Sequence, residues 1–139
     1  MFLLDTNVIS ELRQGKPAQS PAVCAWASHV QISQQFVSAI TILELELGVL
    51  SLERKTPAQG SALRTWFDGV RFAFAGRVLH FTGGVAMRCA KLHVHDRRTD
   101  RDSMIAATAL EHGYSVVTRN VHDFQRAGLT VIDPWQTQL

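Results

Sequence analysis

Short apolar runs alternate along this chain with longer segments in which apolar residues recur every three or four positions. The short runs predict strands, because they are brief, apolar and bounded by polar or turn-forming residues. They lie at positions 2–4, 35–39, 77–81, 115–118 and 129–132. The periodic segments predict helices at positions 8–13, 21–30, 42–54, 61–75, 84–95 and 102–112.

Strands that alternate with helices predict an α/β protein whose central sheet is mainly parallel. Right-handed crossovers place helices on both faces of such a sheet, so we expect an α/β/α sandwich. No internal repeat, low-complexity tract or linker divides the sequence, and 139 residues is the size of one domain. We therefore expect a single domain that spans residues 1–139.

The segment 42–54 fits two periods. Leucines at alternate positions from Leu43 onward are typical of a strand, whereas apolar residues three and four apart from Ile42 onward form a helical stripe. Its Glu and Leu content favours a helix, which we expect Thr41 to cap. Gly48 costs a helix about 1 kcal/mol relative to Ala, so we expect close packing at that position.

Composition excludes several classes of protein. With 46% hydrophobic and 19% charged residues, the chain is too apolar to be disordered. Cys24 and Cys89 show no metal-binding spacing and are typical of reduced thiols in a cytoplasmic protein. No apolar run approaches the ~18 residues of a membrane span, and Asp5 interrupts the first apolar stretch, unlike a signal peptide. We expect a cytoplasmic protein with no membrane association.

The net charge of +2 is too small to predict a nucleic-acid partner by itself. Basic residues gather in the segment 91–102, where Arg97, Arg98 and Arg101 stand beside acids. Taken alone, such a segment is typical of a solvated helix end.

Acidic and amide residues occur where strands end or helices begin. Asp5 follows the first predicted strand, and Glu44 and Asp102 lie in the first turns of predicted helices. Asn120 and Asp123 follow the fourth strand. Because the carboxyl ends of parallel strands meet at one edge of the sheet, where ligands bind, we expect these side chains to gather there.

Carboxylates gathered in this way need a counter-ion, because two unit charges 4 Å apart repel by about 4 kcal/mol at an effective dielectric of 20. A site made of oxygen ligands favours Mg²⁺ or Mn²⁺ over Zn²⁺, and such ions promote phosphodiester hydrolysis. Each residue also has a simpler interpretation. Glu44 and Asp102 match capping boxes that begin at Thr41 and Thr99. Asp5 fits a helix cap, Asp123 a solvated loop acid and Asn120 a turn residue.

Four segments together resemble the PIN-domain family, in particular its VapC-type toxin ribonucleases. They are MFLLDTNVISEL at 1–12, SAITILELELG at 38–48, DSMIAATALEHG at 102–113 and VVTRNVHDF at 116–124. The resemblance implies a Mg²⁺-dependent endoribonuclease, the toxin of a type II toxin–antitoxin system, which inhibits translation. It also implies a homodimer, a VapB-type antitoxin protein as partner and structured RNA, often tRNA, as substrate.

The resemblance assigns roles to particular residues. Asp5, Glu44 and Asp102 match the first three catalytic acids of the family and are the expected metal ligands. Some members carry Asp where this chain has Asn120, and Asp123 lies three residues further on, so the identity of the fourth site residue stays open.

We expect Asp5 and Asp102 to bind Mg²⁺, with Glu44 as a further ligand or as the base that orients water. The residues expected to contact the RNA backbone are Thr6, Arg97, Arg98, Arg101 and Arg119. Two rival functions remain open. One is a phosphatase with an aspartyl nucleophile, although Asn7 stands where a second Asp is usual. The other is a non-catalytic PIN-like protein-binding module, which Asn120 favours.

Overall fold

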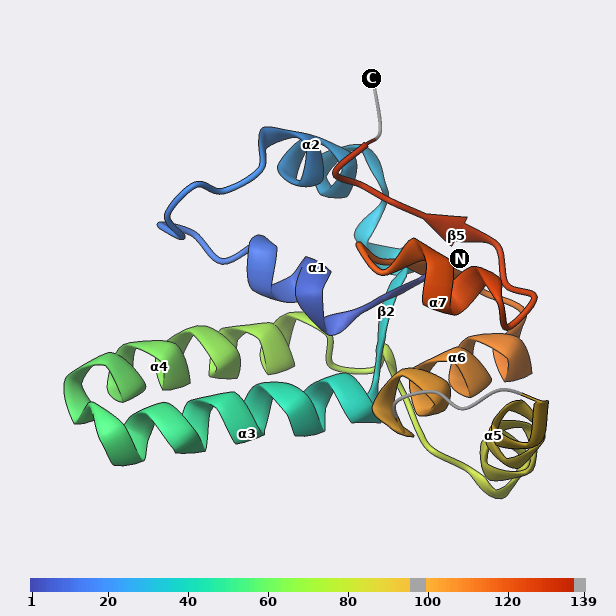
Figure 1. Ribbon diagram of the computed structural model, residues 1–139. Coiled ribbons are helices and arrows are strands. Elements are labelled where there is room, and N and C mark those ends of the chain that lie inside the picture. Colours follow the sequence, from blue (N-terminus) through green and yellow to red (C-terminus); the bar gives the residue numbers. More distant parts are fainter. Residues whose placement is uncertain (96–99, 137–139) are drawn as a thin grey trace.

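The computed structural model describes residues 1–95 and 100–136 (Figure 1). Its centre is a parallel sheet with strand order β3-β2-β1-β4-β5. The strands are β1 (Phe2–Leu4), β2 (Gln35–Ser38), β3 (Val78–Leu79), β4 (Ser115–Val117) and β5 (Val131–Ile132). The predicted α/β class with a parallel sheet is therefore confirmed.

Helices follow the strands in alternation. They are α1 (Thr6–Glu11), α2 (Pro21–His29), the 3-10 turn η1 (Ile32–Gln34), α3 (Ala39–Lys55), α4 (Pro57–Ala73), α5 (Gly83–His95), α6 (Asp100–His112) and α7 (Val121–Gln125). Figure 1 shows α3 and α4 side by side as a long hairpin, with α5 and α6 packed together on the other side of the molecule. The short helix α7 was not predicted, and α4 begins four residues earlier than expected because Pro57 opens it.

Alternate residues of the central strands point to opposite faces of the sheet and build two cores. Leu4 and Val117 pack with the apolar faces of α1, α2, α3 and α4. Their neighbours Leu3 and Val116 pack with α6 and α7 on the other face. Helices therefore cover both faces, which confirms the α/β/α sandwich. In the described part of the chain, no helix is long and apolar enough to cross a membrane.

The start of α3 differs from the prediction in a way that matters for the acidic residues. Ser38, not Thr41, is the N-cap: its Oγ accepts a hydrogen bond of 3.0 Å from the backbone N–H of Thr41. The predicted strand 35–39 accordingly ends at Ser38, and Glu44 lies in the second turn of the helix rather than the first. The capping-box interpretation of Glu44 is therefore wrong.

The expected close packing at Gly48 is also wrong. A Cβ added there meets nothing within 4 Å, and the residue is exposed. The close approach lies instead at Gly60, where α4 passes α3. A Cβ on Gly60 stands 2.6 Å from the backbone nitrogen of Glu53 and closer still to its Cα.

We predict that Gly60→Ala destabilises the protein by about 1–3 kcal/mol, because backbone atoms cannot yield as a flexible side chain can. The matched control is Gly69→Ala in the same helix, where the added methyl meets nothing within 4 Å. It should stabilise by up to about 1 kcal/mol, since Ala favours helix over Gly. Chemical denaturation of both variants checks this; effects of the same sign would contradict it.

Candidate active site

Asp5 connects β1 to α1 and is buried, with 4% of its surface exposed. Its backbone N–H donates to the Val117 carbonyl at 2.9 Å, which extends the pairing of β1 with β4 by one residue. Oδ1 of Asp5 accepts a 2.8 Å bond from the Thr6 N–H, and Oδ2 accepts a 2.7 Å bond from the Thr118 hydroxyl. Both carboxylate oxygens are thus fixed by neighbours at the carboxyl edge of the sheet.

Burial raises the pKa of Asp5 to about 6, because removal from water disfavours the charged carboxylate. The hydrogen bonds from Thr118 and Thr6 oppose this rise, and the negative charges of Asp102 and Glu44 add to it. The pKa of Asp5 therefore depends on the charges of two acids that are remote in sequence. Asp102 stands in the first turn of α6 as predicted, and Glu44 comes from α3.

The Glu44 carboxylate is also held by hydroxyl groups. Its Oε1 accepts a 2.7 Å hydrogen bond from the Thr6 hydroxyl, which lies 3.0 Å from the hydroxyl of Thr41. A hydroxyl carries one proton and a carboxylate only accepts, so Thr41 is the donor to Thr6. Ser38 Oγ lies 3.4 Å from Thr41 Oγ1 and completes the row. Thr41 and Ser38 are fully buried.

Sequence reasoning gave Thr118 no role, yet this fully buried residue organises one side of the site. Besides donating to Asp5, its hydroxyl oxygen accepts from the backbone N–H of Asn120 at 3.0 Å and from Asn7 Nδ2 at 3.4 Å. A threonine at the end of a strand is common, so the sequence alone does not indicate a functional role for it. The only available signal was its position at the carboxyl end of the strand beside β1.

The two candidates for a fourth site residue are both exposed. Asn120 stands at the N-cap position of α7, but its side chain makes no capping hydrogen bond there. Asp123 lies in the first turn of α7. The like charges that raise the pKa of Asp5 come from Asp102 and Glu44. The choice between Asn120 and Asp123 stays a prediction.

Of the arginines expected to contact RNA, two can be placed. Arg101 Nη1 lies 3.9 Å from Oε2 of Glu44, so its guanidinium stands at the rim of the acidic cluster. Arg119 follows Thr118 directly and covers the ring of Trp135 at 5.1 Å. Arg97 and Arg98 lie outside the described residues, as does Thr99, the start of the capping box suggested for Asp102.

The acids fit a magnesium ion only in a particular way. Within residues 1–95 and 100–136, no three acidic, histidine or cysteine side chains form a group that could hold a metal ion directly. Mg²⁺ keeps several of its waters and is often held by only one or two carboxylates. The carboxylates of Asp5, Glu44 and Asp102 suit this kind of binding. One or two of them would contact the ion directly, and the others would hydrogen-bond to water molecules that the ion keeps.

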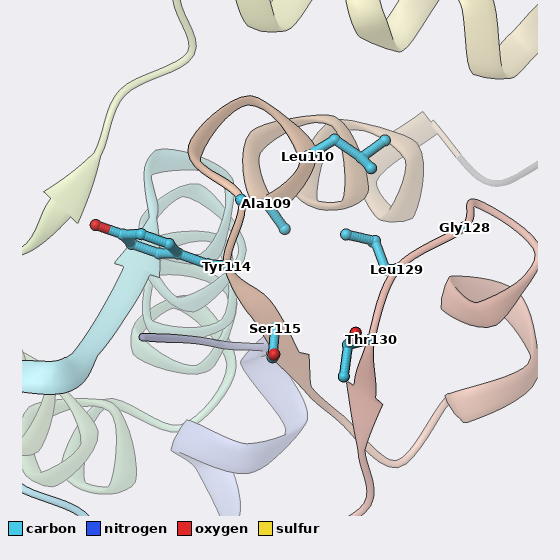
Figure 2. Close-up of a pocket in the computed structure, with 8 residues that line it drawn as sticks. Ala109, Leu110, Tyr114, Ser115, Gly128, Leu129 and Thr130 are labelled. Atoms are coloured by element: carbon cyan, nitrogen blue, oxygen red, sulfur yellow. The ribbon is translucent and has the colours of Figure 1, made fainter.

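A cavity of about 200 Å³ lies at the opposite edge of the sheet, between the end of α6 and the beginnings of β4 and β5. Figure 2 shows Leu110 and Leu129 facing each other across it, while the ring of Tyr114 points away. None of its lining residues carries a carboxylate, imidazole or amine. This cavity therefore offers no chemistry comparable to that of the acidic cluster.

In parallel α/β proteins, ligands bind at the carboxyl edge of the sheet. The fold and the carboxylates at that edge therefore define an α/β domain with a ligand site there. The PIN domain profile matches residues 2–129, so the chain belongs to the PIN-domain family. The resemblance found in the sequence is thus confirmed.

Relatives and solved structures agree with this assignment. The chain is 38% identical to the VapC ribonuclease Y4jK of Sinorhizobium fredii, over 98% of this chain and 99% of that protein. It is 35% identical to toxin FitB of Neisseria gonorrhoeae, over 97% of this chain and 99% of FitB. A chain of the crystal structure of FitAcB from Neisseria gonorrhoeae superimposes with a TM-score of 0.89 at 35% identity, covering 99% of this chain and 100% of that one.

Proposed function

We propose that this protein is a Mg²⁺-dependent endoribonuclease that acts in the cytoplasm as the toxin of a toxin–antitoxin pair and inhibits translation. The observation that carries the proposal is that Asp5, Glu44 and Asp102 come from three remote segments and that the negative charges of Asp102 and Glu44 raise the pKa of Asp5. The ribonuclease and toxin names of the relatives support the same reaction.

In this mechanism Asp5 and Asp102 would hold Mg²⁺, which Mn²⁺ could replace. The ion, when bound, supplies Lewis-acid chemistry: it lowers the pKa of water and stabilises negative charge on a phosphoryl oxygen. Thr118 fixes the Asp5 carboxylate in one orientation. Thr6 fixes Oε1 of Glu44, which leaves Oε2 to orient water or accept its proton. Arg101, near that oxygen, would contact the RNA phosphate.

Cleavage of a structured RNA by the purified protein tests the proposal. With a tRNA mixture we expect internal cuts in the presence of Mg²⁺ or Mn²⁺, none in EDTA, and recovery when excess Mg²⁺ is restored. Cutting that persists in EDTA would contradict the metal requirement. A protein that cuts no RNA but forms a phosphoryl-enzyme would favour the phosphatase, and one that does neither would favour the binding module.

The row of buried hydroxyls leads to a prediction about Thr41. Thr41→Val keeps the shape of the side chain but removes the donor to Thr6, so Glu44 loses its fixed orientation. We expect kcat for RNA cleavage to fall by roughly tenfold, since one hydrogen bond contributes about 1 kcal/mol, while KM stays unchanged. Thr41→Ser should retain most of the activity.

The matched control for Thr41 is Thr108, another fully buried helical threonine. Its hydroxyl donates to the Met104 carbonyl of its own helix at 2.7 Å and not to a residue that holds Asp5 or Glu44. Thr108→Val should leave both kcat and KM unchanged. Equal effects of the two valine variants on kcat would show that Thr41 acts only through stability.

The proposal includes a homodimer and a VapB-type antitoxin. A ribonuclease that can cut the RNA of the cell that makes it needs a partner that inhibits it. An exposed stripe on α3, formed by Leu43, Leu47 and Leu50, supports a subunit contact. We predict that Leu47→Glu converts a dimer to a monomer, measured by light scattering after gel filtration. Val94→Glu, at an exposed apolar position of α5, is the control and should not. A wild-type monomer would contradict the dimer.

A further inference from the structure

Two pairs of arginine and tryptophan lie near α1, the helix that follows Asp5. Trp66 of α4 and Trp135, which follows β5, are both partly exposed. The guanidinium carbon of Arg13 lies 6.0 Å from the ring centroid of Trp66, and that of Arg119 lies 5.1 Å from Trp135. The third tryptophan, Trp26, is 6% exposed and belongs to the core. Thus both tryptophans that reach the surface carry an arginine over the ring.

Both pairs lie along α1, the helix that begins directly after Asp5. The backbone N–H of Arg119 donates to Asn7 Oδ1 in the first turn of α1 at 3.5 Å, and the positive charge of Arg119 helps to lower the pKa of Glu11 in the last turn. Arg13 stands two residues after α1, whose 6 residues span about 9 Å at 1.5 Å each. A strand that crosses the acids could therefore reach both pairs within a few nucleotides.

The Arg13–Trp66 pair opens onto a cavity of about 190 Å³, lined also by Ser10, Lys16 and Leu63. Glu11, in the last turn of α1, already binds Lys16 Nζ at 3.0 Å and the Ser20 N–H at 2.7 Å. Glu11 is therefore largely satisfied by its own neighbours. The guanidinium of Arg13 stays available for an anionic ligand that also presents a flat ring.

We propose that the two pairs form a platform along α1 for unpaired nucleotides next to the cleaved phosphodiester. Bases stack on tryptophan rings, and arginine adds both a planar contact and a positive charge for phosphate. The occupant is single-stranded RNA, because an aromatic ring with a cation above it suits a base joined to a phosphate. This platform rests on the proposed ribonuclease function and adds to it the residues that bind the RNA strand.

Binding of a short unstructured RNA to the full-length protein tests the platform. We use fluorescence anisotropy of a labelled oligonucleotide in EDTA, in a background that carries Asp5→Asn, so that the RNA stays intact. Trp66→Leu and Trp135→Leu should each weaken binding by roughly tenfold, as the loss of one stacked base does. An oligonucleotide of the same length with abasic sites should bind the parent and the two tryptophan variants alike.

Two further variants separate stacking from folding. Arg13→Glu removes the cation without deleting core volume and should also weaken binding. Phe72→Leu is the control, because Phe72 is an aromatic residue of the same helix with 86% of its surface exposed; this variant should bind as the parent does. Melting curves identify any variant that fails to fold.

The outcomes distinguish this inference from the proposed function. If the wild-type protein cuts RNA but the tryptophan variants and Arg13→Glu bind it as tightly as the parent, the platform is wrong and the pairs serve the core or a protein partner. An equal loss on abasic RNA would show that charge alone acts, which also overturns stacking. If the wild-type protein neither binds nor cuts RNA, both proposals fail.

Discussion

Replacing Asp5 with asparagine should abolish RNA cleavage and at the same time make the metal-free protein more stable. The pKa of Asp5 is raised from 3.8 to about 6, so its ionised form costs the folded state about 3 kcal/mol at neutral pH. Asparagine removes that charge but loses an acceptor for the Thr118 hydroxyl, at a cost of about 1 kcal/mol. We expect a net gain of about 1–2 kcal/mol in the free energy of unfolding.

The pH dependence gives this prediction a sharper form. Between about pH 4 and pH 6 the folded protein keeps a proton on Asp5 that the unfolded chain has released. Stability in EDTA should therefore fall as pH rises through this window, and Asp5→Asn should remove this contribution to the slope. Above pH 6, Mg²⁺ should stabilise the wild-type protein by binding the folded state and should do so far less for the variant. Thermal unfolding across pH, with and without Mg²⁺, measures all of this.

Asp68→Asn is the matched control, since Asp68 is an exposed acid on α4. It should change neither the pH slope nor the response to Mg²⁺. A metal-free Asp5→Asn protein that melts below the wild type at neutral pH would contradict the electrostatic account. An Asp5→Asn protein that still cuts RNA would contradict the catalytic role.

The gathering of acids could be predicted because it follows from topology. Once β1 and β4 are recognised as neighbouring parallel strands, the residue after each strand must lie at the same edge. The hydroxyls that hold these acids could not be predicted in the same way. Thr118 meets Asp5 only because the Asp5 N–H continues the ladder to Val117, and a shift of one residue would turn the Thr118 side chain to the other face.

The start of α3 shows why capping patterns alone mislead. Ser38 and Thr41 are both good N-cap residues, but only Thr41 stands three residues before a Glu, so the capping-box pattern favours the wrong residue. The length of β2 decides between them, because the strand ends at Ser38 and the helix begins at once. The close packing at Gly60 likewise depends on how α3 and α4 cross, which no local pattern of Gly48 or Gly60 reveals.

With Ser38 as the cap, Glu44 has no capping role to explain it, and Glu44→Gln becomes a direct test of its charge. Glutamine keeps an oxygen that accepts from the Thr6 hydroxyl, so the helix and the hydrogen bond are preserved. Without the negative charge, RNA cleavage should fall by about 10²- to 10⁴-fold, the usual contribution of a general base. Steady-state cleavage of a mapped RNA site measures the loss.

The same substitution has a second consequence that does not depend on activity. Because the Glu44 charge helps to raise the pKa of Asp5, Glu44→Gln should lower that pKa and reduce the fall in stability between pH 4 and pH 6. Glu46→Gln is the control: Glu46 lies on the same helix but pairs with Arg64 at 2.6 Å, so its loss should leave cleavage and the Asp5 pKa unchanged. If Glu44→Gln cuts RNA like the wild type while Asp5→Asn does not, catalysis depends on Asp5 without Glu44 as base.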